Sequence, residues 1–133
     1  MQERKTGRIA GLATVLALVL TQSALAADCA PAQVEKGAAL FGSDCSVCHS
    51  AKADGPAMMG PNLHGLYGRT SGSLAGFSYS QAMKAKAVDW QLDSLEQFIA
   101  QPQAFVGGTY MPYAGMASAD DRRAVGCFLG AQK

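Results

Sequence analysis

A short run in the first half of the chain holds the residues best suited to chemistry. The run is Cys45-Ser46-Val47-Cys48-His49, and its spacing is that of a c-type haem attachment site. Two thiols separated by two residues can add to the two vinyl groups at one edge of a porphyrin, and the adjacent histidine can then bind the iron. The run therefore predicts a covalently attached haem with His49 as one iron ligand.

Two other interpretations of the same run are less well supported. A zinc site would need a second pair of ligands at short spacing, and His64 with Cys127 does not supply one. A thiol oxidoreductase would need a βαβ pattern nearby, and the sequence shows none. The haem interpretation is therefore favoured over both.

A second iron ligand would decide whether the haem passes electrons or binds small molecules. Met111 is favoured because residues 107–113 form a glycine-rich, aromatic-flanked segment without helical periodicity, which suits it to wrapping a flat ring. Met116 is the nearest competitor, and Met83 falls in a segment expected to be helical, where it would pack. Loop character alone leaves the choice open among the candidates, which are Met58, Met59, Met83, Met111, Met116 and His64.

The elements that would position these residues are helices. Pro31 marks the start of a first helix. Its apolar residues recur at helical spacing and comprise Val34, Ala38 and Phe41, with Gly37 beside them. The haem run follows this predicted helix directly in the sequence.

Capping pairs indicate two later helices. Asp93 and Glu96 would open one helix, which Pro102 would end, and its apolar face comprises Leu95, Phe98 and Ile99. Ser118 and Asp121 would open the last helix, whose apolar face comprises Val125, Phe128 and Leu129. No strand pattern, repeat or long linker competes with these signals, so we predict a small all-α domain with long loops.

The first 26 residues have the layout of a secretory signal peptide. A basic start is followed by an uncharged apolar run at residues 9–20 and by the small-x-small sequence Ala24-Leu25-Ala26. The run is shorter than the roughly 20 residues that span a bilayer, which weighs against an uncleaved anchor. We predict cleavage after residue 26, a mature domain of residues 27–133, and export to the periplasm without stable membrane insertion.

Cleavage would leave a nearly neutral chain. The whole sequence has 11 basic and 10 acidic residues, and loss of Glu3, Arg4, Lys5 and Arg8 leaves eight and nine. This balance does not indicate a nucleic-acid or polyanion binder. A domain of this size can build only a modest core, which favours a cofactor or a cross-link.

A series of segments matches one known family in order. The segments are Val34-Glu35-Lys36-Gly37, Phe41, the run at 45–49, residues 60–69, residues 76–80, Trp90, Pro102, residues 108–111 and Ala114-Gly115. On these segments the chain resembles a class I c-type cytochrome, of the mitochondrial cytochrome c and bacterial cytochrome c2 type, over nearly its whole predicted mature length. The resemblance implies the cytochrome c fold, with loops wrapped around one haem and the terminal helices crossing at Gly37.

The resemblance also implies roles for individual residues. It places the methionine ligand at Met111, and at Pro61 it places the carbonyl that accepts the second ring proton of His49. Around the haem propionates it places Arg69, Tyr79 and Trp90. It also implies a hydroxyl beside the methionine loop and an aromatic ring near the exposed haem edge, which correspond to Thr109 and Tyr113.

Three departures from the family pattern change what the resemblance implies. Gln103, Ala104 and Tyr110 occupy positions where the family has lysines, so electrostatic steering toward an acidic partner should be weak. Phe98 replaces a tyrosine whose hydroxyl bonds the methionine sulfur in mitochondrial relatives. Gly107 replaces a proline, which should make the ligand loop more mobile.

Two cysteines remain outside the haem run. The family has no counterpart of Cys29 and Cys127, but crossing terminal helices would bring the two together. We predict an intramolecular disulfide between them. A disulfide-linked dimer and free thiols are the alternatives.

The sequence thus predicts a monomeric, monohaem carrier that moves single electrons between periplasmic or membrane-bound redox proteins and catalyses no bond-making reaction. With His49 and Met111 in both axial positions, no substrate could bind the iron without displacing a ligand. One alternative is a ligand sensor or peroxidase-like enzyme that releases Met111, although no distal histidine–arginine pair supports it. Another is an electron-accepting subunit of one dehydrogenase.

Overall fold

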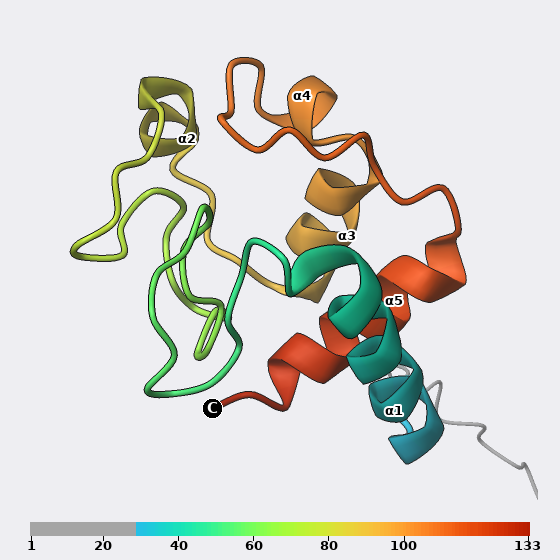
Figure 1. Cartoon of the computed structure of the whole chain (residues 1–133). Coiled ribbons are helices and arrows are strands. Elements are labelled where there is room, and N and C mark those ends of the chain that lie inside the picture. The colour runs from blue at the N-terminus through green and yellow to red at the C-terminus, as the bar shows by residue number, and fades with distance from the viewer. Residues whose placement is uncertain (1–28) are drawn as a thin grey trace, which may run out of the picture.

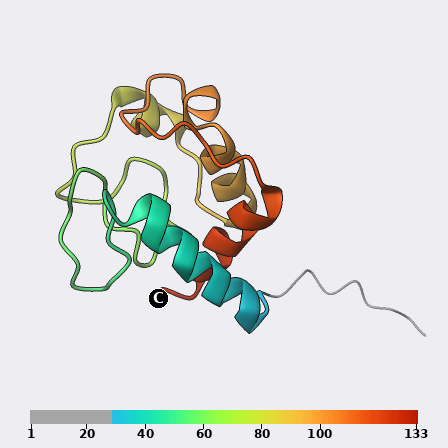
Figure 2. The ribbon, with the colours of Figure 1, turned by 45° about the vertical axis from the view of Figure 1, so that its right-hand side comes forward.

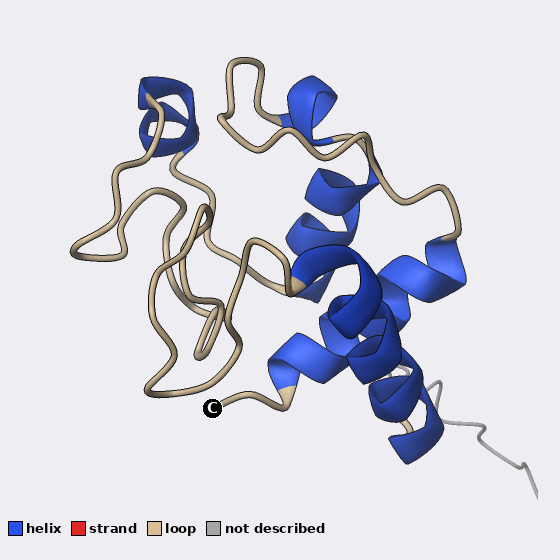
Figure 3. Cartoon of the chain, in the orientation of Figure 1, coloured by secondary structure: helices blue, strands red, loops and turns tan. Residues whose placement is uncertain are grey.

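The computed structural model describes residues 29–133, and its regular elements there are helices (Figures 1 and 3). In chain order they are α1 (Pro31–Leu40), the π-helical turn η1 (Phe41–Cys45), α2 (Gln81–Lys86), α3 (Leu92–Ala100), α4 (Pro102–Phe105) and α5 (Ala119–Gly130). Within this range one isolated bridge, Thr70 to Asp89, is the nearest approach to a sheet. The predicted all-α fold is confirmed, whereas the predicted signal peptide, residues 1–26, lies outside the described residues.

The connections between the helices are long, and the helices are short. In Figures 1 and 2 the connection from η1 to α2, drawn green to yellow, forms one side of the molecule, and α3 and α5 form the other. None of the described helices has both the length and the apolarity that crossing a membrane requires. The loops therefore form much of the shell around the interior.

The first and last helices pack directly against each other (Figures 1 and 2). Gly37 is buried in this contact, where an added Cβ would lie 1.9 Å from the carbonyl oxygen of Ala124. Beside it the rings of Phe41 and Phe128 pack with their centroids 5.2 Å apart. A residue without a side chain lets the two backbones touch, so the predicted crossing at Gly37 is confirmed.

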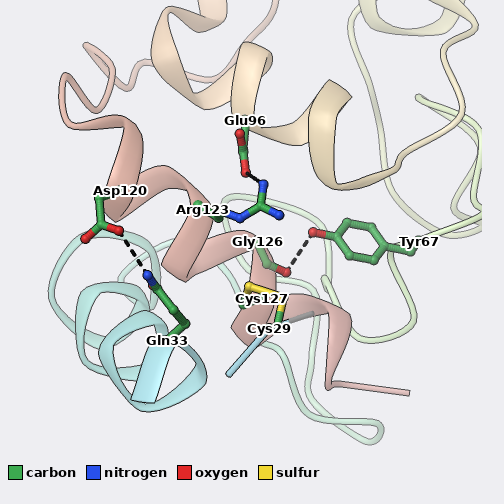
Figure 4. Close-up of a disulfide and its surroundings, with 8 residues drawn as sticks. All are labelled: Cys29, Gln33, Tyr67, Glu96, Asp120, Arg123, Gly126 and Cys127. Atoms are coloured by element: carbon green, nitrogen blue, oxygen red, sulfur yellow. Dashed lines mark hydrogen bonds and ion pairs between the residues drawn. A yellow bond between two sulfur atoms is a disulfide. The ribbon is translucent and has the colours of Figure 1, made fainter. Parts of the chain in front are cut away.

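Contacts on several sides hold α5 in place (Figure 4). A disulfide joins Cys127 on α5 to Cys29, just before α1, with Cα atoms 5.4 Å apart and a sequence separation of 98. The guanidinium of Arg123 lies 3.3 Å from the carboxylate of Glu96 on α3. From the long loop, the Tyr67 hydroxyl donates a hydrogen bond of 2.7 Å to the carbonyl of Gly126.

Polar contacts also fix the start of α5 against α1. The ammonium of Lys36 pairs with Asp120 and Asp121, and the amide of Gln33 donates to Asp120 at 2.9 Å. Both carboxylates lie in the first turn of α5, where the helix dipole favours negative charge. Because Asp120 is largely exposed, these pairs orient the helices more than they stabilise them.

The start of α3 corrects the predicted capping pair of Asp93 and Glu96. The N-cap is Gln91, whose side chain accepts from the backbone of Ser94, while the Ser94 hydroxyl accepts from the backbone N–H of Gln91 at 2.9 Å. Asp93 lies inside the first turn, and Glu96 is engaged with Arg123. The predicted apolar face is confirmed, because Leu95, Phe98 and Ile99 are all buried.

Two other predicted features fare differently. The hydroxyl of Ser118 accepts from the backbone N–H of Asp121 at 3.2 Å, so Ser118 caps α5 as predicted. Ala38, however, is exposed, although the sequence pattern placed it on the apolar face of α1. The contact with α5 is centred on Gly37 and Phe41, which are four residues apart, and this rotates Ala38 toward solvent.

We expect Gly37→Ala to destabilise the protein, because the new methyl group would overlap the carbonyl of Ala124. Overpacking of this kind costs about 1–3 kcal/mol. The matched control is Gly42→Ala, because a Cβ at Gly42 would meet no atom within 4 Å. Guanidinium unfolding curves should place Gly37→Ala well below the wild-type midpoint and Gly42→Ala at or above it. Equal midpoints for the two variants would contradict the close crossing.

Candidate functional site

The loops and helices enclose one large apolar cavity. Its volume is about 660 Å³. Its walls come from η1 and the turn after it, the long loop from there to α2, α2, α3, the segment between α4 and α5, and α5 itself. The cavity lining includes every residue predicted to bind haem or iron, namely Cys45, Cys48, His49, Pro61, Arg69, Tyr79, Trp90, Thr109 and Met111.

The cysteine pair reaches the cavity because the helical path continues past Cys45. The backbone N–H groups of Cys48 and His49 both donate to the carbonyl of Cys45, at 3.0 and 2.9 Å. This turn places both half-buried thiols and the imidazole on the cavity wall. Burial, followed by the nearby Asp44 carboxylate, raises the pKa of Cys45 to about 11.

These properties argue against the other two interpretations of the cysteine run. A redox-active cysteine pair needs a thiol whose pKa is lowered, and that of Cys45 is raised. A zinc site needs a cluster of ligands, and among residues 29–133 no three His, Cys, Asp or Glu side chains gather in that way. Both observations weigh against these two interpretations and are compatible with covalent attachment of a haem.

The ring of His49 is held in one orientation. Its Nδ1 lies 2.7 Å from the carbonyl oxygen of Pro61, so Nδ1 carries the proton and Nε2 is left as the nitrogen with a free lone pair. Gly60 packs against the ring, and an added Cβ there would lie 2.2 Å from Cε1. Burial lowers the pKa of His49, and the hydrogen bond to the Pro61 carbonyl opposes this shift only in part. The lowered pKa favours the neutral ring.

Met111 lies on the same cavity, half-buried, in a segment without regular structure. Its backbone N–H donates to the hydroxyl of Thr109 at 3.3 Å, and Thr109 is itself buried. Met59, Met83 and Met116 also line the cavity. Met58 and His64 do not line the cavity, which disfavours both as ligands.

Three larger side chains form a polar corner of the cavity. The guanidinium of Arg69 donates to the carbonyl of Asn62 at 2.9 Å, and burial lowers its pKa. No acidic side chain in the described part of the chain pairs with Arg69. Tyr79 lies near Arg69, and Trp90 is buried against Phe98 with ring centroids 5.3 Å apart.

The sequence did not predict several residues of the apolar wall. Leu63, Leu66 and Phe77 line the cavity from the long loop, where no periodicity marks them. Met83 and Met116 were expected to pack or to compete as ligands, and both lie on the wall. A loop wall of this kind becomes recognisable only once the chain has closed around the cavity.

Comparison with known proteins agrees with this geometry. The family model for cytochrome c matches residues 34–131. The chain belongs to the cytochrome c family. The cytochrome c of Ulva intestinalis is 40% identical over 103 residues, covering 77% of this chain and 93% of that protein. The cytochrome c of Arabidopsis thaliana is 41% identical over 95 residues, covering 71% and 85%.

Membership of the cytochrome c family makes the chain a haem electron carrier and implies covalently bound haem c. The cavity fits such a group on three counts. Two thiols and an oriented imidazole lie together on its wall. The wall is largely apolar, as a porphyrin face requires. Arg69 supplies a half-buried cation that pairs with no acidic side chain of residues 29–133, as a propionate requires.

Proposed function

We propose that this cytochrome c carries single electrons between periplasmic redox partners through one haem. Thioethers from Cys45 and Cys48 would hold the haem, and His49 and Met111 would fill its axial positions. The observation that carries the proposal is one cavity that brings both thiols, the imidazole and the methionine together. The sequence holds one Cys-x-x-Cys-His run, which supports a single haem.

The residues around the cavity would act by holding their positions. Pro61 fixes the tautomer of His49, which makes Nε2 the better ligand. The soft sulfur of Met111 favours ferrous iron and so raises the reduction potential. The apolar walls exclude water and disfavour added positive charge. The bound haem would supply the one-electron centre, and the chain itself transfers no proton or group.

We expect the reduced protein to ignore carbon monoxide at neutral pH, because both axial positions are filled. Met111→Ala should bind the gas and should lose the weak near-infrared band of methionine sulfur on ferric iron. Met58→Ala is the matched control, because Met58 does not line the cavity. Visible and near-infrared spectra follow both properties. Loss of the band in Met116→Ala but not in Met111→Ala would identify Met116 as the iron ligand. Binding of carbon monoxide by the wild type would favour a ligand sensor over an electron carrier.

Export would allow the disulfide between Cys29 and Cys127 to form and persist. The signal-like residues 1–26 support export, and the bond would join the mature N-terminus to α5. Since Cys45 and Cys48 would be consumed by thioethers, the exported protein would contain no free thiol. The bond would then act as a staple across nearly the whole domain, which lacks a large core of its own.

Reduction of this disulfide should lower the melting temperature without releasing haem. Closing a loop with a sequence separation of 98 stabilises by about 4–5 kcal/mol on the loop-entropy model. Differential scanning calorimetry with and without a reductant, on protein from a periplasm that matures c-type haem, measures the shift. Cys29→Ser/Cys127→Ser should melt like the reduced protein. An unchanged melting curve would contradict a stabilising role for this disulfide.

Docking would take place at the mouth of the cavity, which carries apolar side chains. Val47, Met59 and Tyr110 line the cavity and are 68%, 75% and 76% exposed. Within residues 29–133 no lysine lines the cavity, whereas Asp44 does. Such a surface suits a partner with an apolar, weakly charged face, and association should depend little on long-range charge.

Oxidation of the reduced protein by hexacyanoferrate(III) should therefore depend weakly on ionic strength. Ala104→Lys restores a positive charge on the exposed surface of α4, so it should speed the reaction at low salt and steepen the salt dependence. Ala104→Gln, which adds length without charge, is the control. Stopped-flow rates over a range of salt concentrations measure the effect. A steep fall with salt in the wild type would contradict a weakly charged docking surface.

A further inference from the structure

The segment carrying Met111 lacks two features that the resemblance leads one to expect. Phe98 offers no hydroxyl to the methionine sulfur, and Gly107 does not restrict the backbone as a proline would. From the sequence, these changes predict a looser loop. The structure instead shows side-chain contacts at both ends of the segment.

The first contact is made by the side chain of Gln103 on α4. Its Nε2 donates to the carbonyl of Thr109 at 2.9 Å and to that of Met111 at 3.3 Å. Its Oε1 accepts from the backbone N–H of Gly108 at 3.3 Å. A primary amide can donate twice and accept at once, which neither a lysine nor a carboxylate can do.

The base of this contact is well anchored. Gln103 follows Pro102, which is fully buried at the start of α4. The backbone N–H of Val106 returns to the carbonyl of Pro102 at 2.9 Å, and that of Thr109 returns to Val106 at 3.0 Å. Gln103 therefore joins the loop to a fixed turn of the core.

The second contact lies on the other side of Met111. The hydroxyl of Tyr113 donates to Oδ2 of Asp44 at 3.2 Å. Asp44 comes directly before Cys45, and its other oxygen accepts from the hydroxyl of Ser43 at 2.7 Å. Tyr113 therefore ties the end of the loop to the segment that would anchor the haem.

We propose that Gln103 and Tyr113 are positioning residues that clamp the Met111 loop at its two ends and set how readily its sulfur leaves the iron. The clamp rests on the proposed function, because it presumes that Met111 is the ligand. It takes over the restraint that Phe98 and Gly107 no longer supply. Gln103, at a position where the family has a lysine, thus serves ligation in this chain and not charge.

Imidazole binding to the ferric holoprotein tests the clamp, because imidazole takes the iron only when Met111 has left it. Apparent affinity rises with the fraction of protein whose loop is open. Loss of one hydrogen-bonded tie should raise that affinity about fivefold in Gln103→Leu and in Tyr113→Phe, and about 25-fold in the double variant. Gln97→Leu, the same change at an exposed position of α3, should match the wild type.

Two further variants separate positioning from general loss of stability. Gln103→Glu keeps the size of the side chain but loses the two donated bonds, so it should resemble Gln103→Leu. Asp44→Ala should match Tyr113→Phe, and combining the two should add nothing, because both break one contact. Guanidinium unfolding curves should be measured in parallel. The change in the free energy of unfolding should be smaller than the change in the free energy of imidazole binding. Additive effects of Asp44→Ala and Tyr113→Phe on imidazole affinity would contradict a role for the contact between these two residues.

The remaining outcomes distinguish the clamp from the proposed function. If the wild type shows the near-infrared band and the Gln103 and Tyr113 variants bind imidazole as it does, the clamp is wrong and the carrier stands. If the wild type has no such band and binds imidazole readily, Met111 is not the ligand, and both proposals fail.

Discussion

The structure depends on a constraint of size: the described chain folds around an apolar cavity of about 660 Å³. A group that fills an apolar space of this volume gives the surrounding residues the contacts of a packed core. Several large buried apolar residues, among them Leu66, Trp90 and Phe98, line this cavity. Binding a flat apolar group would therefore complete the core as well as supply the chemistry.

The helices matter chiefly for where they deliver the loops. The contact of α1 with α5 at Gly37 sets the direction in which η1 leaves the helix pair, and this brings the cysteine turn to the cavity. The bond from His49 to Pro61 then joins that turn to the long loop. The helix crossing and one wall of the cavity therefore belong to one continuous stretch of chain.

The sequence predicted what depends on local pattern or on fixed spacing. The cysteine–histidine run on the cavity wall, the apolar face of α3 and the cap at Ser118 belong to this class. The close approach at Gly37 came instead from the family resemblance. The sequence did not predict the contacts that arise only after closure. The N-cap of α3 is Gln91, because Ser94, three residues later, completes a capping pair with it. The sequence alone did not distinguish this pair from Asp93 and Glu96.

The three hydrogen bonds of Gln103 show the same limit more clearly. The sequence identified Gln103 as a missing charge, which says nothing about where its amide points. Likewise Tyr113 and Asp44 are 69 residues apart, and neither carries a local signal for the other. Side-chain to backbone contacts within loops depend on the tertiary path of the chain, so these contacts become visible only in the structure.

An NMR spectrum of the reduced protein, labelled at its methionine methyl groups, tests the ligation of the iron by Met111 most directly. A methyl group bound above the centre of a haem is shifted far upfield by the ring current. If Met111 binds the iron, one such methyl resonance is expected, and it disappears in Met111→Leu. An upfield resonance that survives in Met111→Leu and is lost in Met116→Leu would contradict ligation by Met111, as would the absence of any upfield methyl.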